Sequence, residues 1–580
     1  MKRTTPFFKP IFFLSAVAFL LAIALPFPAA ASNCSKKCAT EDCKSKCSVN
    51  TLKEEVSSLQ KKVENLEKQN DWAQDDMEDM SGRLDKAEMH TATDKVSFGV
   101  YLRTRADSIH YDDMRGAPAS LMGAFFAPPP YGFNGATLPQ IQQGMQQMAM
   151  NGMIPPPESY DADNDIIYTN KFRLDMKARV NENLRFDGRL AAYKVYGDSS
   201  GVKFNQGSLG DVTFDGNTSS LPHGDTIHLE RAYFVYSQEY GAVPVSLSLG
   251  RRPSTDGPPL EYGNYDVVGG SPFASIINWQ FDGASLSFGL ENIVPVPGAS
   301  FKLCYGLGYE ADWGNSNSLN YSGSDLEDVH LLGFITDLYS KDRTSLGLNY
   351  AHAFDITDGF TGTSVMPFTI AKQDTNGDGE AEYYFEQNTG GFISRLEPMT
   401  NIGDWDAASL LYRTNLSDKF ADIDLFLAGS WTHTNPTEIS KNPFYEMMGM
   451  GLLSSNGDLQ SRDGYGIYTG ALFPMPYQAR LGLEYNWGSK YWFNFTGAED
   501  SLIGSKLAVR GDVYEAYYIQ PIIDKNFFVR VGTQYYDYKY TGSGNPLGKP
   551  VEIASANALD TINPVADEVW NYYLSATLSF

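Results

Sequence analysis

The last eleven residues of the chain, 570–580, alternate between two kinds of side chain. One series is large or apolar, and the other is mostly small and polar: Phe580, Leu578, Ala576, Leu574 and Tyr572 against Ser579, Thr577, Ser575 and Tyr573. Strict alternation is the period of a β-strand whose two faces meet different environments. A fold that contains this strand must therefore place one face of a sheet against an apolar medium and the other against a polar one.

Segments of the same kind recur throughout residues 95–580. We predict strands at 96–108, 168–180, 184–196, 226–238, 243–252, 274–290, 299–312, 328–339, 343–355, 403–416, 420–434, 478–487, 490–496, 505–519, 526–540 and 566–580. Short and long connections alternate between them, as in outer-membrane barrels. The expected fold is an all-β transmembrane, antiparallel barrel of about 16 strands, with fourteen or eighteen as alternatives because 478–504 has the weakest pattern.

The second and third predicted strands carry charge on one face and apolar residues on the other. The charged face is expected to line the lumen, since charge on the lipid face is costly. The candidate pore-lining residues, of which the last three come from the end of the fifth predicted strand and the loop after it, are Lys171, Arg173, Lys177, Arg179, Arg185, Arg189, Arg252, Asp256 and Glu261. The six cationic residues of the two strands form a basic face that attracts anions or faces an acidic loop, to which Asp256 and Glu261 belong. The alternative is a solvated face paired with Asp175 and Asp187.

Residues 1–31 have the basic start, apolar run and small-residue site of a secretory signal peptide. The segment 32–50 holds four cysteines, Cys34, Cys38, Cys43 and Cys47, for which disulfides are expected and a four-thiolate metal site is the alternative.

Residues 51–90 have a heptad seam typical of a coiled-coil stalk. The seam comprises Leu52, Val56, Leu59, Val63, Leu66, Asn70, Ala73, Met77, Met80, Leu84 and Ala87. A coiled coil needs partner helices, so we expect a homo-oligomer through 52–87, by analogy with many porins a homotrimer.

Composition excludes some classes of function. A net charge of −25 makes nucleic acid an unsuitable partner, because phosphate binding needs basic patches. The 7 histidines form no H-E-x-x-H motif, and no G-x-S-x-G stretch stands in the strand-to-helix context of a hydrolase nucleophile, so we predict no catalytic residues and no enzyme.

Residues 374–380 fit the first half of a calcium-binding loop. Asp374, Asn376, Asp378 and Glu380 supply oxygen atoms, and Gly379 occupies the turn position. Position twelve is Phe385, where calcium loops have an acidic residue. We expect either a structural calcium ion here or a polar loop without metal, and no other cofactor.

Three segments resemble an uncharacterised family of porin-like bacterial outer-membrane barrel proteins with a signal peptide and a coiled coil (domain of unknown function 3373). They are GRRPSTDGPPLE, YTNKFRLDMKARVNENLRFDGRLAAYK and LGLEYNWGSKYWFNFTG. The terminal aromatic also resembles the C-terminal signal of outer-membrane barrels. The resemblance implies fold and location, with the stalk in the periplasm, and it supplies no functional residue.

The sequence thus predicts an outer-membrane porin, a passive channel for small hydrophilic solutes, with anions as the candidate class. The alternative is a structural protein that tethers the outer membrane to the cell wall or to a periplasmic partner through the coiled coil.

Overall fold

We describe a computed structural model of the chain. It describes residues 53–54, 56–63, 96–197, 226–255, 257–264, 273–311, 326–359, 362–365, 368–387, 393–396, 398–448, 453, 459–497, 501–544 and 548–580. The chain divides into the units Met1–Thr93 and Asp94–Phe580. The predicted signal peptide, the four clustered cysteines and most of the predicted stalk lie outside the described residues.

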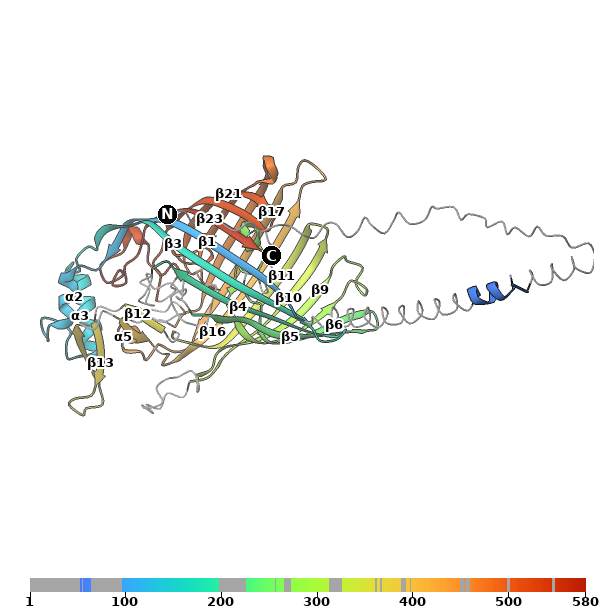
Figure 1. Ribbon diagram of the computed structural model, residues 1–580. Helices are drawn as coiled ribbons and strands as arrows, with labels where there is room; N and C mark the ends of the chain where they lie inside the picture. The colour runs from blue at the N-terminus through green and yellow to red at the C-terminus, as the bar shows by residue number, and fades with distance from the viewer. Residues whose placement is uncertain are drawn as a thin grey trace, which may run out of the picture. The chain divides into compact units, whose positions relative to one another are not determined.

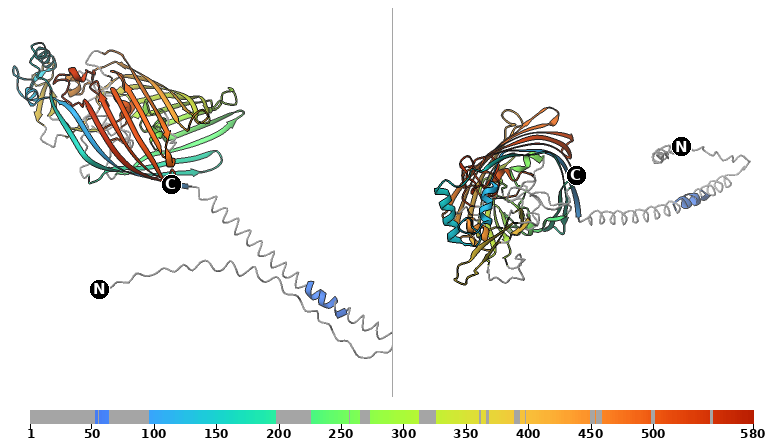
Figure 2. Two further views of the ribbon diagram at one scale, coloured as in Figure 1. Left: turned by 90° about the horizontal axis from the view of Figure 1, so that it is seen from above. Right: turned by 90° about the vertical axis from the view of Figure 1, so that its left-hand side faces the viewer.

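The second unit is an antiparallel barrel, seen in Figures 1 and 2. Its wall is closed and has sixteen strands. In the first half of the chain these are β1 (Val96–Gly116), β3 (Glu158–Arg179), β4 (Leu184–Val195), β5 (His228–Tyr240), β6 (Val243–Arg252), β8 (Phe281–Gly289), β9 (Ser300–Tyr309) and β10 (Val329–Lys341). The remainder are β11 (Thr344–Thr357), β16 (Asn401–Asn415), β17 (Asp424–Pro436), β18 (Arg462–Pro474), β19 (Arg480–Gly488), β21 (Gly511–Ile523), β22 (Phe527–Tyr538) and β23 (Glu568–Ser579). The predicted fold class is confirmed.

The last strand closes the barrel in the way its alternation predicts. β23 pairs with β22 on one side and with β1 on the other, so its two edges are both satisfied. Leu574 and Leu578 are 53% and 38% exposed, whereas Ser575 and Thr577 between them are 3% and 2% exposed. The apolar series therefore faces outward and the polar series faces the interior, as expected of a barrel in lipid.

Among the described residues, no helix is long and apolar enough to cross a lipid bilayer.

The predicted strand count is confirmed, but two assignments near its weakest segment are wrong. Residues 462–474 were expected in a loop and form wall strand β18, whereas 490–496 were expected in the wall and lie inside the barrel. The two errors cancel in the count. β18 was missed because Gly464 and Gly466 leave the first part of its inner face without side chains and make it resemble a turn. A Cβ at Gly466 would come within 2.9 Å of Trp492.

The long connections fold into a separate cap at one end of the barrel. It contains α2 (Ala119–Phe126), β2 (Ala136–Thr137), α3 (Leu138–Met150), β13 (Phe368–Gln373), β14 (Glu382–Gln387) and α5 (Pro443–Met448), seen together at the left of Figure 1. Its core packs Phe125, Phe133, Phe368 and Phe385 against one another. Aromatic side chains from distant loops thus give this cap a core of its own.

At the opposite end of the barrel, short turns connect neighbouring strands. The carboxylate of Asp422, in the turn between β16 and β17, contacts arginine side chains at two other turns. Arg480 and Arg343 contact its carboxylate, and Asn415 Nδ2 donates to it over 2.9 Å. The hydrogen bond from Arg480 and those from Asn415 and Arg343 lower the pKa of Asp422 from 3.8 to about 2, against the opposing effect of burial. The charged form is therefore favoured in the folded protein.

Asp422→Asn is expected to lower stability by up to about 1 kcal/mol near neutral pH, because exposed ion pairs are worth little. A depressed carboxylate pKa stabilises the fold above the unfolded value, and this contribution is lost as pH falls from about 3.8 through about 2. Urea unfolding of both proteins across this range measures the difference. If the difference in stability between the two proteins grew as the pH fell, the lowered pKa of Asp422 would be contradicted.

Candidate functional site

The barrel interior carries its positive charge on neighbouring strands. Phe172 is 38% exposed on the outer face of β3, whereas the flanking Lys171 and Arg173 are 0% and 7% exposed and point inward. Arg189 on β4 shares this inner face, with Arg103 and Arg105 on β1 and Arg231 on β5. We call the six side chains Arg103, Arg105, Lys171, Arg173, Arg189 and Arg231 the basic wall.

The remaining predicted residues of this face lie nearer the short turns. Lys177, Arg179 and Arg185 are exposed, and Arg185 Nε is 3.2 Å from Asp187 Oδ2. Arg252 at the end of β6 is half-buried, and its Nε donates to Ser248 Oγ over 2.9 Å. Strand alternation places these four side chains on the inner face of the barrel. Their role in lining a pore stays a prediction.

Glu230 occupies the centre of the basic wall and was not predicted. It is completely buried, with Arg189 Nη1 at 3.1 Å and Arg173 Nε at 3.6 Å from its carboxylate oxygens. Arg189 Nε also donates to Asp175 Oδ1 over 2.6 Å. The predicted pairing with Asp175 and Asp187 therefore exists, together with a carboxylate that the pattern did not reveal.

A β-bulge explains why Glu230 was missed. Arg231 faces Arg189 and Leu229 faces Leu190, so Glu230 is an extra residue on β5. Strict alternation would place it outward with Phe234, which is 41% exposed. A carboxylate expected on the lipid face is the signal that could have indicated the bulge, because such a charge is costly there.

The described residues of two long connections pack inside the barrel against its wall. The first, residues 253–280, contains η2 (Leu260–Asn264) and β7 (Ile277–Asn278), and the second, residues 489–510, contains β20 (Phe495–Thr496) and η4 (Lys506–Ala508). We call them the first and second inner segments. β7 and β20 pair in parallel, so the two inner segments support each other.

Aromatic contacts hold both inner segments against the wall. Trp279, Trp405 and Phe495 are nearly or fully buried in one cluster, and the rings of Trp405 and Phe495 meet edge to face at 4.7 Å. Trp405 Nε1 donates to the carbonyl of Phe493 over 3.2 Å. The side of the interior lined by β10, β11 and β16 is therefore a packed core and not open water.

The first inner segment also reaches the wall opposite this core. Arg530 Nη1 on β22 donates to the carbonyl of Gly263 over 2.7 Å, and the Arg530 guanidinium lies over the ring of Tyr573 at 4.9 Å. Glu261 lies in the same 3-10 turn, and only its backbone is described. Asp256 lies outside the described residues, so the predicted contact of these two acids with the basic wall stays a prediction.

The predicted calcium loop forms the tip of the β13–β14 hairpin. Asp374 accepts hydrogen bonds from the amides of Gly377 and Gly379 over 2.6 and 3.0 Å, and Asp378 accepts one from the amide of Glu380. Across the described ranges, no group of three His, Cys, Asp or Glu residues is arranged to hold a metal ion. Structural calcium at Asp374, Asn376, Asp378 and Glu380 stays a prediction.

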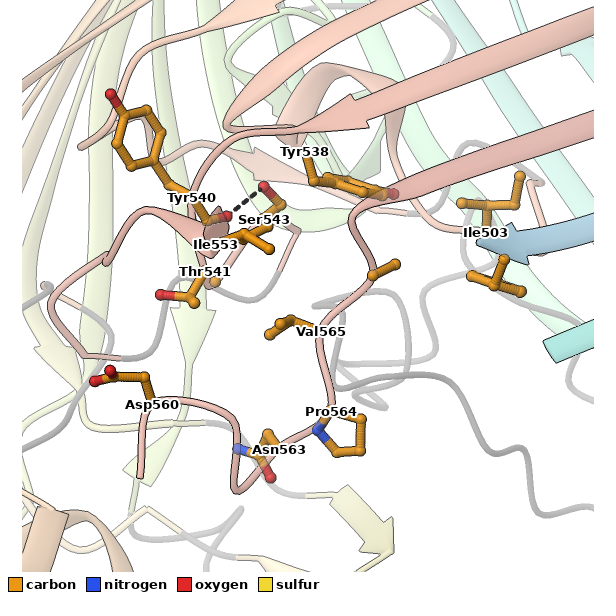
Figure 3. Close-up of a pocket in the computed structure, with 13 residues that line it drawn as sticks. Ile503, Tyr538, Tyr540, Thr541, Ser543, Ile553, Asp560, Asn563, Pro564 and Val565 are labelled. Carbon is orange, nitrogen blue, oxygen red and sulfur yellow. Dashed lines mark hydrogen bonds between the residues drawn. The ribbon is translucent and has the colours of Figure 1, made fainter. Parts of the chain in front are cut away.

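A cavity of about 90 Å³ lies at the long-loop end and is lined mainly by the connection from β22 to β23 (Figure 3). Tyr538, Tyr540 and Ser543 line one side, and Asn563 and Pro564 line another. Asp560 is the only charged residue among those that line it, and burial raises its carboxyl pKa. The cavity has room for a few water molecules, each of about 30 Å³.

The closed sixteen-stranded barrel, with an apolar outer face, loops long at one end and inward-folded segments, has the fold of outer-membrane porins. The chain belongs to the family described as "Protein of unknown function (DUF3373)", which matches residues 161–580. No curated protein matches the sequence.

Several solved porin structures are similar in fold. The Salmonella typhi OmpF complex with daunomycin is 12% identical, with 83% of this chain and 97% of that chain covered and a TM-score of 0.37. OprB of Pseudomonas putida is 12% identical, with 85% and 96% covered and a TM-score of 0.38. The anion-selective porin from Comamonas acidovorans is 10% identical, with 84% and 99% covered and a TM-score of 0.39. At such identities and scores no residue role or solute is transferred to this chain.

Proposed function

We propose that the protein is an outer-membrane channel that passes small hydrophilic anions by diffusion. The observation that carries the proposal is the basic wall, in which six cationic side chains from four neighbouring strands gather inside a protein of net charge −25. Charge that faces the lumen of a barrel sets which ions enter it. The barrel fold and the family membership support a channel in the outer membrane.

The inner segments make the channel narrow. The described residues of the basic wall are all less than a tenth exposed, and Trp279 and Trp405 fill the side lined by β10, β11 and β16. A barrel of this strand number leaves a wide aqueous lumen when its interior is empty. We therefore propose a restricted, selective path along the basic wall rather than a general diffusion pore.

Purified full-length protein in planar bilayers should form channels with conductance well below that of an unobstructed sixteen-stranded barrel. In a salt gradient, the reversal potential should show preference for the anion. Arg173→Gln is expected to reduce this preference several-fold, because it removes a charge from the wall. Lys341→Gln, at the exposed end of β10, is the matched control. Absence of conductance, or cation preference in the unmodified protein, would contradict the proposal.

We also propose that the chain is a homo-oligomer with its stalk in the periplasm. Val56, Leu59 and Val63 of the predicted seam are 50%, 58% and 50% exposed in the single chain, as expected of apolar residues that need partner helices. The barrel begins at Val96, which pairs with Ala178 next to the short turn that joins β3 to β4. Short turns of outer-membrane barrels face the periplasm, which supports the proposed location.

A further inference from the structure

Two carboxylates face each other inside the barrel on adjoining strands. Glu484 on β19 and Glu515 on β21 are direct cross-strand partners, and they are only 8% and 7% exposed. Like charges directly opposite one another destabilise a strand pair, and burial increases the cost. A cation is therefore required between them if both are to stay ionised.

The cation comes from the second inner segment. Lys506 Nζ lies 2.5 Å from Glu484 Oε2 and 2.7 Å from Glu515 Oε2. The carboxylates also accept hydrogen bonds from tyrosine hydroxyls: Tyr468 and Tyr517 donate to Glu484 over 2.6 and 2.7 Å, and Tyr573 donates to Glu515 over 2.7 Å. The wall thus provides a site for one ammonium group, and the inner segment occupies it.

The wall closes without this segment. β19 pairs directly with β21 along eight residues, from Arg480↔Ile519 to Trp487↔Asp512, so residues 489–510 are an insertion that the barrel does not need for closure. Lys506 attaches this insertion to the wall by charge, and Asn486 Nδ2 attaches it again by donating to the carbonyl of Lys506 over 2.7 Å. Withdrawal of Lys506 would leave the strand pairing in place.

We propose that Lys506 is a tethered ligand of a two-carboxylate site for primary ammonium groups, and that its release loosens residues 501–508 of the second inner segment from the wall and widens the lumen there. Lys506 is then a positioning residue, which acts through the segment that it holds. The effect on conduction rests on the proposed channel function. The ammonium site itself rests only on Glu484, Glu515 and the three tyrosines.

The test is chemical rescue of the full chain in detergent or lipid nanodiscs. Lys506→Ala should raise hydrogen exchange at the amides of 501–508 at least tenfold, with little change in the wall strands. Propylammonium, which replaces the deleted carbons and the ammonium, should restore slow exchange. Tetramethylammonium, which has no N–H to donate, should not. Lys490→Ala in the same segment is the matched control, because Lys490 lies over the rings of Tyr491 and Tyr540, away from the carboxylate pair.

Two further variants keep the test decisive if the alanine variant does not fold. Lys506→Met keeps most of the side-chain volume without charge and should also speed exchange, whereas Lys506→Arg should keep it slow. Unchanged exchange in both uncharged variants, or rescue by tetramethylammonium as good as by propylammonium, would overturn the ammonium site.

Conductance measured on the same samples separates this inference from the channel function. A several-fold increase in the conductance of Lys506→Ala that propylammonium reverses supports both. An exchange response in a protein that never conducts supports the site and contradicts the channel. If conductance changes neither in the variant nor on addition of the amine, the proposed widening is contradicted and the proposed channel function is not.

Discussion

Replacing Glu230 with glutamine is expected to lower the free energy of unfolding by about 3–5 kcal/mol, because removal of one partner leaves buried charges uncompensated. Glu230 is completely buried, and its carboxylate lies 3.1 Å from Arg189 and 3.6 Å from Arg173. Glutamine keeps the shape and one acceptor oxygen but removes the negative charge. The effect is therefore electrostatic and not a loss of packing.

Urea unfolding of the refolded barrel in vesicles would measure this change. Glu239→Gln is the control on the same strand, since Glu239 is exposed next to the β5–β6 turn and should change stability by less than about 0.5 kcal/mol. Equal stability of Glu230→Gln and the unmodified protein would mean that water or ions already compensate the basic wall. The interior would then be more open than its burial indicates.

Trp405→Ala is expected to lower the free energy of unfolding by about 3–5 kcal/mol, the usual cost of removing a large buried aromatic side chain. Trp405 is completely buried, meets Phe495 edge to face, and donates a hydrogen bond to the carbonyl of Phe493. It belongs to wall strand β16, whereas its partners belong to the second inner segment. The substitution should therefore loosen the attachment of this segment as well as the whole barrel.

Hydrogen exchange at 492–496 together with urea unfolding would separate the two effects. Leu410→Ala lies on the same strand but faces outward, with 47% exposure, and should leave exchange at 492–496 unchanged. A loss of stability without faster exchange at 492–496 would show that the segment has other, stronger attachments. Faster exchange in the Leu410 variant would show that the readout is not specific to the inner face.

The outer face of the barrel was predictable because its residues obey one simple period. Leu574 and Leu578 alternate with Ser575 and Thr577, and the structure places the two series in lipid-facing and inward positions. β18 was not predictable in this way, since Gly464 and Gly466 carry no side chain to mark its inner face. Those glycines are required by the close approach of Tyr491 and Trp492, a contact between segments that lie apart along the chain.

The candidate site shows the same division. Lys171, Arg173 and Arg189 were assigned to the inner face from alternation alone, and Arg103 and Arg105 follow from the same rule applied to β1. Glu230 escaped this rule because a bulge shifts the pairing of β5 by one residue. Alternation could not place Lys506 either, because a segment between wall strands has no period that indicates whether it lies outside the barrel or returns inside.

The sequence by itself determined the class of fold and which faces of most strands meet lipid, whereas the count of sixteen was reached through two errors that cancel. These properties depend on local periodicity and on connection lengths, which are both readable along the chain. Only the tertiary structure decided what fills the barrel. Packing of Trp279, Trp405 and Phe495, and the position of Lys506 between two carboxylates, depend on contacts between residues far apart in sequence, and no local pattern encodes which of them meet.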